Sequence, residues 1–143
     1  MGAIRCFVLA ALVGCAARLP EGWEDARPVA SLVQTECGGS PYEAFDERVE
    51  VDLASDPLVV EAFETHFRCA QDVEGFVREE GDAVEVLVQP IDMTPKVVAG
   101  CDCLYDLVIE VGARPDDLAR VSVYRRWDDL NDANDPVLIG EVE

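Results

Sequence analysis

Five side chains in this sequence are of types that bind metals, catalyse reactions or form disulfides when they lie close together. They are the single histidine and four cysteines beyond residue 30, namely His66, Cys37, Cys69, Cys101 and Cys103. Thiolates and imidazole bind zinc, and a histidine beside a nucleophile can act as a general base. Four cysteines in an oxidising compartment instead predict two disulfides. We expect disulfides, because the C-x-C at 101–103 is not a usual zinc spacing. Metal binding or catalysis through His66 and the cysteines is the alternative.

The spacing of Cys101 and Cys103 bears on how the cysteines pair. In an extended strand both side chains point to the same face, with Cα atoms roughly 6.5–7 Å apart, which is at the upper limit for a bridge. Each is therefore expected to reach a different partner. Cys69 ends one expected strand and Cys37 lies in a glycine-rich turn. We predict the pairs 69–103 and 37–101, with 69–101 and 37–103 as the alternative.

The segment 128–135, D-D-L-N-D-A-N-D, concentrates oxygen ligands. Calcium takes oxygen ligands only, and Asp129, Asn131, Asp132 and Asp135 are its candidates here. The segment lacks the glycine and the closing glutamate of an EF-hand loop, and Asp and Asn also favour turns for local reasons. We expect a solvated loop, with calcium binding as the alternative, and we expect no cofactor.

The cysteine pair opens the most regular strand pattern of the chain, over residues 100–112. Alternate residues from 101 to 111 form an inward face, which consists of Cys101, Cys103, Tyr105, Leu107, Ile109 and Val111. Asp102, Asp106 and Glu110 fall on the outward face. This pattern predicts a half-buried β-strand.

The segment 58–69 is ambiguous. Its apolar residues fit one stripe of a helix that starts at Asp56-Pro57. They also fit a strand in which Val59, Phe63, Phe67 and Cys69 share one face. We expect a strand, because the neighbouring segments all have a period of two.

Eight short strands with turn signals between them are expected. They cover 28–35, 48–53, 58–69, 73–78, 83–91, 102–111, 121–127 and 137–142, and a four-residue loop at 79–82 makes a hairpin. Their number and spacing predict an all-β protein, a single immunoglobulin-like β-sandwich of about eight short antiparallel strands.

The N-terminus has the features of an exported protein. Arg5 precedes an apolar run at 6–13 that is too short to span a bilayer. The run ends in L-V-G-C, which resembles a bacterial lipobox. The resemblance implies a signal peptide (1–14), palmitate or a related acyl chain on Cys15, and a membrane anchor. Because Ala16 is not the aspartate linked to inner-membrane retention, it also implies the outer membrane. An ordinary secretory signal is the alternative.

Beyond the signal we expect an anchor and tether at 15–27 and one domain at 28–143. Phe67-Arg68-Cys69 and the C-D-C-L-Y-D at 101–106 together resemble a group of small envelope lipoproteins of unknown function. That resemblance implies an immunoglobulin-like or related β-sandwich and lends no activity.

The charge of the chain limits its partners. It has 11 Lys and Arg against 30 Asp and Glu, a net charge of −19, which repels nucleic acid and anionic lipid head groups. Trp127 beside Arg125 and Arg126 could anchor a protein partner, but alternation with Val121 and Val123 favours a core position. We expect a lipid-anchored structural or binding module that is not an enzyme, with a protein partner in the envelope. The alternative is a periplasmic metal-binding protein or an envelope enzyme.

Overall fold

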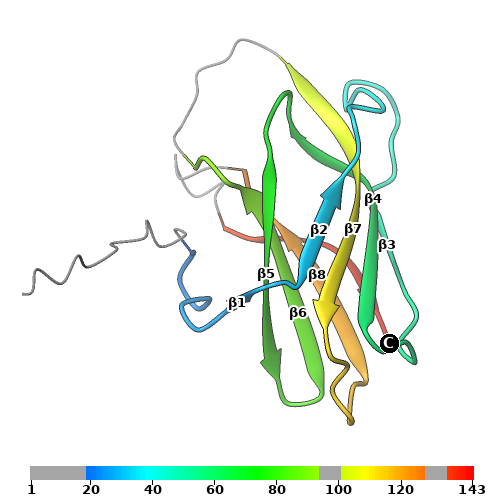
Figure 1. Ribbon diagram of the computed structural model, residues 1–143. Helices are drawn as coiled ribbons and strands as arrows, with labels where there is room; N and C mark the ends of the chain where they lie inside the picture. Colours follow the sequence, from blue (N-terminus) through cyan, green and yellow to red (C-terminus); the bar gives the residue numbers. More distant parts are fainter. Residues whose placement is uncertain (1–18, 94–100, 128–134) are drawn as a thin grey trace, which may run out of the picture.

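The computed structural model describes residues 19–93, 101–127 and 135–143. These residues form nine strands and no helix, in two sheets packed face to face (Figure 1). The five-stranded sheet has the order β1-β5-β6-β8-β9, and the four-stranded sheet has the order β2-β7-β4-β3. The strands are β1 (Arg27–Pro28), β2 (Ser31–Gln34), β3 (Arg48–Val51), β4 (Leu58–Arg68), β5 (Val73–Glu80), β6 (Ala83–Pro90), β7 (Asp102–Gly112), β8 (Arg120–Arg125) and β9 (Val137–Val142). The expected all-β sandwich is confirmed.

Strand β7 lies in the middle of the four-stranded sheet and supplies much of the core. Its predicted inward side chains are buried, and Cys103 and Ile109 have no exposed surface. Cys101, which was expected on the same buried face, precedes the strand and is exposed. Leu104 points outward but is also buried, because the backbone at Gly39 pairs with it and covers it.

The ambiguous segment is strand β4, as expected, but a bulge changes the faces of its side chains. Its register against β7 shifts between Ala62 and Thr65, and Glu64 within the bulge has a φ of 52°. A bulge adds a residue to one strand only, so the alternation reverses across it. Val59 therefore points outward whereas Phe67 is fully buried. The prediction that these residues share a face is wrong for this reason.

Two connections differ from those expected. The hairpin between β5 and β6 turns on only two residues, Gly81-Asp82, and Gly81 adopts the positive φ of 66° that such turns require. Strands β6 and β8 run parallel, whereas an antiparallel arrangement was expected. The chain leaves β6, crosses to the other sheet as β7 and returns as β8, so both strands point the same way. The immunoglobulin-like identity stays a prediction.

The two sheets approach each other closely at two points. The expected strand 28–35 is split into β1 on one sheet and β2 on the other, and between them the N–H of Val29 donates to the carbonyl of Gly75, 3.0 Å away. A Cβ on Gly75 would lie 2.9 Å from Val29 Cγ2, and one on Gly140 of β9 would lie 2.5 Å from Val49 Cγ2 of β3. A side chain at either position would force the neighbouring valine to move, so glycine allows the close approach at both points.

Residues 19–26 pack on the outer face of the five-stranded sheet. Trp23 is only 4% exposed and lies with Phe76 and Leu87 in a small cluster, and the Arg78 guanidinium lies 4.2 Å from the centre of its indole ring. This cluster covers Leu87 of β6, and all eight residues of that strand are buried. The expected tether is thus part of the folded domain from Leu19 onward.

Candidate functional site

The four cysteines form two disulfides, Cys37–Cys103 and Cys69–Cys101, with Cα–Cα distances of 5.7 and 5.4 Å. Two bridges were predicted, but the favoured pairing is wrong and the alternative is confirmed.

The register of β4 against β7 explains this pairing. It sets Arg68 opposite Asp102, so the next residue along β4, Cys69, lies opposite Cys101, and its N–H donates to the Cys101 carbonyl (3.0 Å). Cys103 is thereby left for Cys37, which the bridge between Gly39 and Leu104 brings beside it.

These bridges account for every cysteine in the described part of the chain. In the disulfide form the four sulfurs are not thiolates, which are the form that binds zinc. Among the described residues, no three or more His, Cys, Asp or Glu side chains gather in a way that could hold a metal ion.

His66 lies on the outward face of β4, where aromatic and charged side chains surround it. Its side chain is 14% exposed, and its ring meets that of Trp127 edge to face, with centroids 4.7 Å apart. Phe45 packs against it from another side at 6.0 Å. The imidazole Nε2 lies 3.4 Å from Asp102 Oδ2, within ion-pair distance but without hydrogen-bond alignment. These contacts describe a packed ring that links β4 to its surroundings.

The backbone of His66 is also held by side chains. Strand β3 pairs with β4 only as far as Phe63, so the edge of β4 beyond that point needs other partners. The His66 N–H donates to Glu47 Oε1 (2.8 Å), and Trp127 Nε1–H donates to the His66 carbonyl (2.8 Å). Such side-chain cover protects a sheet edge from unwanted pairing.

Arg125 of β8 connects this edge to the other sheet. Its guanidinium donates twice to Glu47, at 2.9 and 3.0 Å, and lies 4.9 Å from the centre of the Trp127 ring. Trp127 packs against the core, as alternation predicted. This cluster therefore fastens the two sheets together.

Two of the expected sites fall outside the described residues. Cys15, the candidate for acylation, is one, and the calcium candidates Asp129, Asn131 and Asp132 are the other. Of that set, Asp135 alone is described, and it is exposed.

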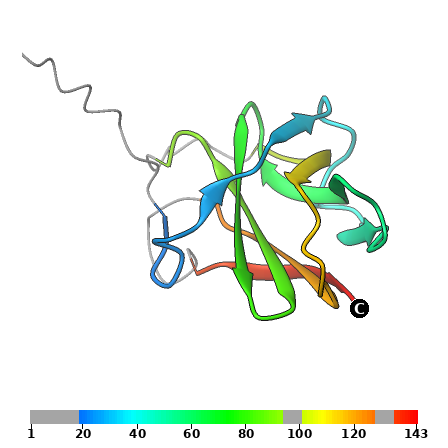
Figure 2. The ribbon, with the colours of Figure 1, turned by 60° about the horizontal axis from the view of Figure 1, so that its bottom comes forward.

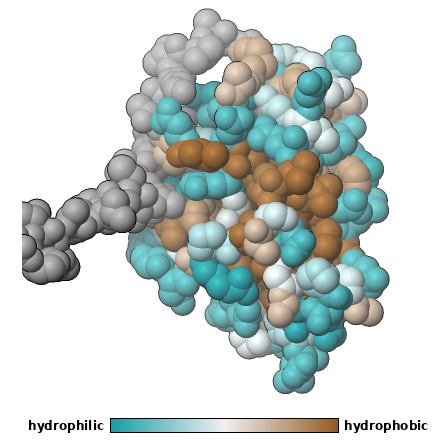
Figure 3. Space-filling view, in the orientation of Figure 1, coloured by the Kyte–Doolittle hydropathy of each residue, from teal (hydrophilic) through white to brown (hydrophobic). Residues whose placement is uncertain are grey.

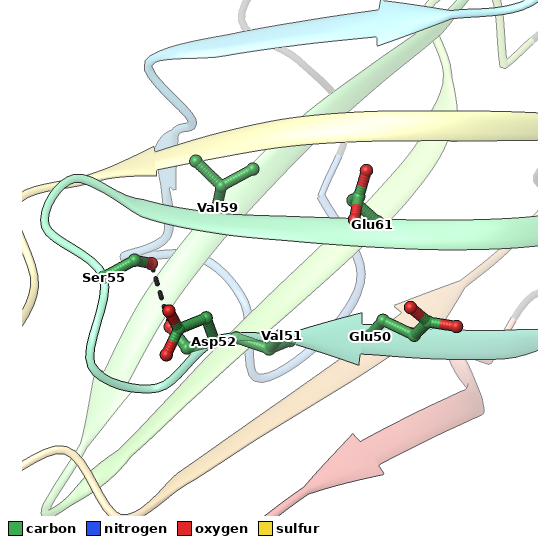
Figure 4. Close-up of a pocket in the computed structure, with 6 residues that line it drawn as sticks. All are labelled: Glu50, Val51, Asp52, Ser55, Val59 and Glu61. Atoms are coloured by element: carbon green, nitrogen blue, oxygen red, sulfur yellow. Dashed lines mark hydrogen bonds between the residues drawn. The ribbon is translucent and has the colours of Figure 1, made fainter.

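An acidic cavity lies on the outer face of the four-stranded sheet, where β3 turns into β4 (Figure 4). Its volume is 420 Å³, and it is lined by Glu50, Val51, Asp52, Ser55, Val59 and Glu61. Ser55 Oγ donates to the Asp52 carbonyl (2.8 Å), which fixes the turn at one end. Glu50, Asp52 and Glu61 come together only through the pairing of β3 with β4, which local sequence patterns do not predict.

An apolar stripe adjoins this cavity. Val33 of β2 and Val108 of β7 are directly paired, point outward and are 61% and 41% exposed. Apolar atoms gather over β2 and β7 in the surface view, with hydrophilic atoms around them (Figure 3). Val108 is also paired with Glu61, so the stripe continues into the acidic cavity.

Comparisons with known proteins give no relative for this chain. No protein-family model matches the sequence, and neither the curated proteins nor the solved structures contain a match. Within the described ranges, no helix has the length and apolar character that crossing a membrane requires.

Proposed function

We propose that this chain is a lipid-anchored protein of the bacterial envelope whose β-sandwich works as a structural or binding module. The sequence L-V-G-C supports the anchor, since it places Cys15 where such proteins are acylated. Ala16 after that cysteine supports the outer membrane as the destination.

The observation that carries the proposal is the pair of disulfides. Structural disulfides persist in oxidising compartments and are rare in the bacterial cytosol. Here both bridges fasten the start of β7, the central strand, to segments 66 and 32 residues away in sequence. A domain fastened in this way suits exposure outside the cytoplasm.

The exposed outer face of the four-stranded sheet supports a binding role. Residues 19–26 pack on part of the opposite outer face, around Phe76 and Leu87, and Figure 2 shows this segment on the side of the molecule away from β3 and β4. A chain anchored upstream of residue 19 would therefore leave the acidic cavity and the apolar stripe open to a partner.

Metabolic labelling with a palmitate analogue tests the anchor. The unmodified chain should take up label and fractionate with membranes. Cys15→Ser should lose the label, because its hydroxyl does not replace the thiol in lipoprotein processing. Cys6→Ser is the matched control, since it removes a cysteine of the same apolar segment outside L-V-G-C. Label that persists in Cys15→Ser would show that the anchor proposal is wrong.

A further inference from the structure

The outer face of the four-stranded sheet combines apolar and acidic side chains in register. One row across the four strands reads Val33, Val108, Glu61 and Glu50, each directly paired with the next. The adjoining row includes Glu110 of β7, which is paired with Val59 of β4. In the first row the apolar side chains lie on β2 and β7 and the acidic side chains on β4 and β3, whereas in the adjoining row the acidic residue is on β7 and the apolar one on β4. The apolar half of the face is therefore the Val33–Val108 pair, and the acidic half is the Glu61–Glu50 pair with Asp52.

The acidic half is unfavourable for the domain alone. Glu50 and Glu61 lie directly opposite each other on β3 and β4, and like charges in such cross-strand pairs destabilise a sheet. Asp52 adds a third carboxylate to the same cavity. Arg48 Nε approaches Glu50 Oε1 at 3.5 Å, but both side chains are about half exposed, so the attraction is weak. A bound cation would relieve this repulsion.

We propose that this face binds a cationic polypeptide segment of an envelope partner. A lysine or arginine of the partner enters the cavity between Glu50, Asp52 and Glu61, and an apolar side chain of the partner covers Val33 and Val108. Charge complementarity favours a cationic occupant. The N-terminal segment packs on the other sheet, so it leaves this face accessible to a partner. The inference deepens the proposed function, because it names the surface and the partner chemistry of the binding module.

The geometry sets the spacing that the partner needs. The centre of the valine pair and the centre of the glutamate pair are two strand spacings apart, or about 10 Å. A polyproline II segment has three residues per turn, so side chains three residues apart lie on one face about 9 Å from each other. On a helix, side chains seven residues apart lie on one face about 10 Å from each other. The partner should therefore carry its basic residue three or seven positions from an apolar one.

Titration with labelled peptides tests the proposal. The probes are two twelve-residue peptides, one flexible with lysine three residues from leucine and one helical with lysine seven residues from leucine, each with a glutamate-for-lysine counterpart. The full chain is purified from its own membrane or soluble fraction, and fluorescence anisotropy is read at 0.15 M salt. At least one lysine peptide should bind, and its glutamate counterpart should not.

Matched variants separate a built site from general attraction to an acidic protein. Glu50→Gln with Glu61→Gln should weaken binding about tenfold. Glu80→Gln with Asp82→Asn removes the same charge at the β5–β6 hairpin and should change binding less than about twofold, because salt screens distant charges. Val108→Ser should weaken binding about fivefold, and Val137→Ser, an exposed valine of β9, should not.

Equal losses from both charge pairs, or no binding by either lysine peptide at millimolar concentration, would overturn the inference. Neither outcome depends on acylation of Cys15, since the titration uses whichever fraction holds the protein. Failure of the lipid anchor and failure of the docking face are therefore distinguished.

Discussion

Removing the disulfides one at a time should show that each stabilises the whole domain. The Cys69–Cys101 loop, with a sequence separation of 32, lies inside the Cys37–Cys103 loop, with a separation of 66. In the chain-entropy model, closing the smaller loop contributes about 3.7 kcal/mol. The larger loop would contribute roughly 4.4 kcal/mol by itself, but the inner bridge shortens it to about 35 residues, so its added contribution is about 3.8 kcal/mol.

The two bridges should therefore contribute nearly equally despite their different separations. We expect Cys69→Ala with Cys101→Ala to lower the free energy of unfolding by about 3 kcal/mol, because the remaining bridge then closes the whole outer loop. Cys37→Ala with Cys103→Ala should cost somewhat more, because Cys103 is fully buried and its truncation also loses packing. Loss of both bridges removes roughly 7–8 kcal/mol, which is comparable with the whole stability of a small domain. The reduced protein should be unfolded.

Urea unfolding followed by tryptophan fluorescence measures these losses. The two tryptophans report different places, since Trp23 lies on the outer face of the five-stranded sheet and Trp127 lies beside His66. Single-tryptophan variants should give coincident transitions if the domain unfolds as one unit. A reduced protein that keeps its cooperative transition, or a loss under 1 kcal/mol for either pair, would refute the argument that both bridges fasten the domain.

Three further predictions concern single contacts. Gly140→Ala should lower the free energy of unfolding by about 1–3 kcal/mol in urea titrations, because its Cβ would lie 2.5 Å from Val49 Cγ2. Gly38→Ala is the control and should be tolerated, because its Cβ would lie 3.8 Å from the nearest atom, the Leu104 carbonyl oxygen. Equal losses from the two variants would contradict the packing argument. Arg125→Met should lower the free energy of unfolding by about 3–5 kcal/mol, because it leaves the largely buried Glu47 carboxylate without a cation. Adding Glu47→Gln should restore part of that loss, and a simple sum of the two single losses would count against the pairing argument. Burial and the nearby Glu85 carboxylate raise the pKa of Tyr124, so the folded state holds this proton more tightly than the unfolded state. The free energy of unfolding should therefore be intact below pH 10 and fall above it. Tyr124→Phe should lessen this fall in alkaline melting curves, and an unchanged pH profile would disprove the argument.

Alternation alone predicts which side chains reach the core between Cys103 and Val111, because β7 keeps its period of two there, whereas Cys101 precedes the strand and is exposed. It fails on β4, where the bulge at Glu64 reverses the faces, and no sequence signal marks that residue as one with positive φ. It also fails to choose between the two cysteine pairings. That choice depends on how far β4 is offset against β7, which the packing of both strands decides.

Composition misled the expectation for residues 19–26. The segment is polar and contains Pro20 and Gly22, as linkers do, but it also contains Trp23. One large apolar side chain is enough to fix a short segment when a matching surface exists. Phe76 and Leu87, which point away from the main core, supply that surface. Their outward positions become visible only when β5 and β6 are placed in a sheet.

The paired carboxylates of Glu50 and Glu61, on the outer face of the four-stranded sheet, are a feature that the stability of the fold does not explain. A sheet chosen for stability alone would place opposite charges, or apolar side chains, at the paired positions of Glu50 and Glu61. The repulsion costs the domain some stability, but two nested disulfides contribute several times more. The covalent bridges thus allow the outer face to carry a charge pattern that weakens the fold. Residue pairs that weaken a fold are found most often where a surface serves a function. Here the Glu50–Glu61 pair lies beside the exposed Val33 and Val108, on the sheet face opposite the N-terminal segment.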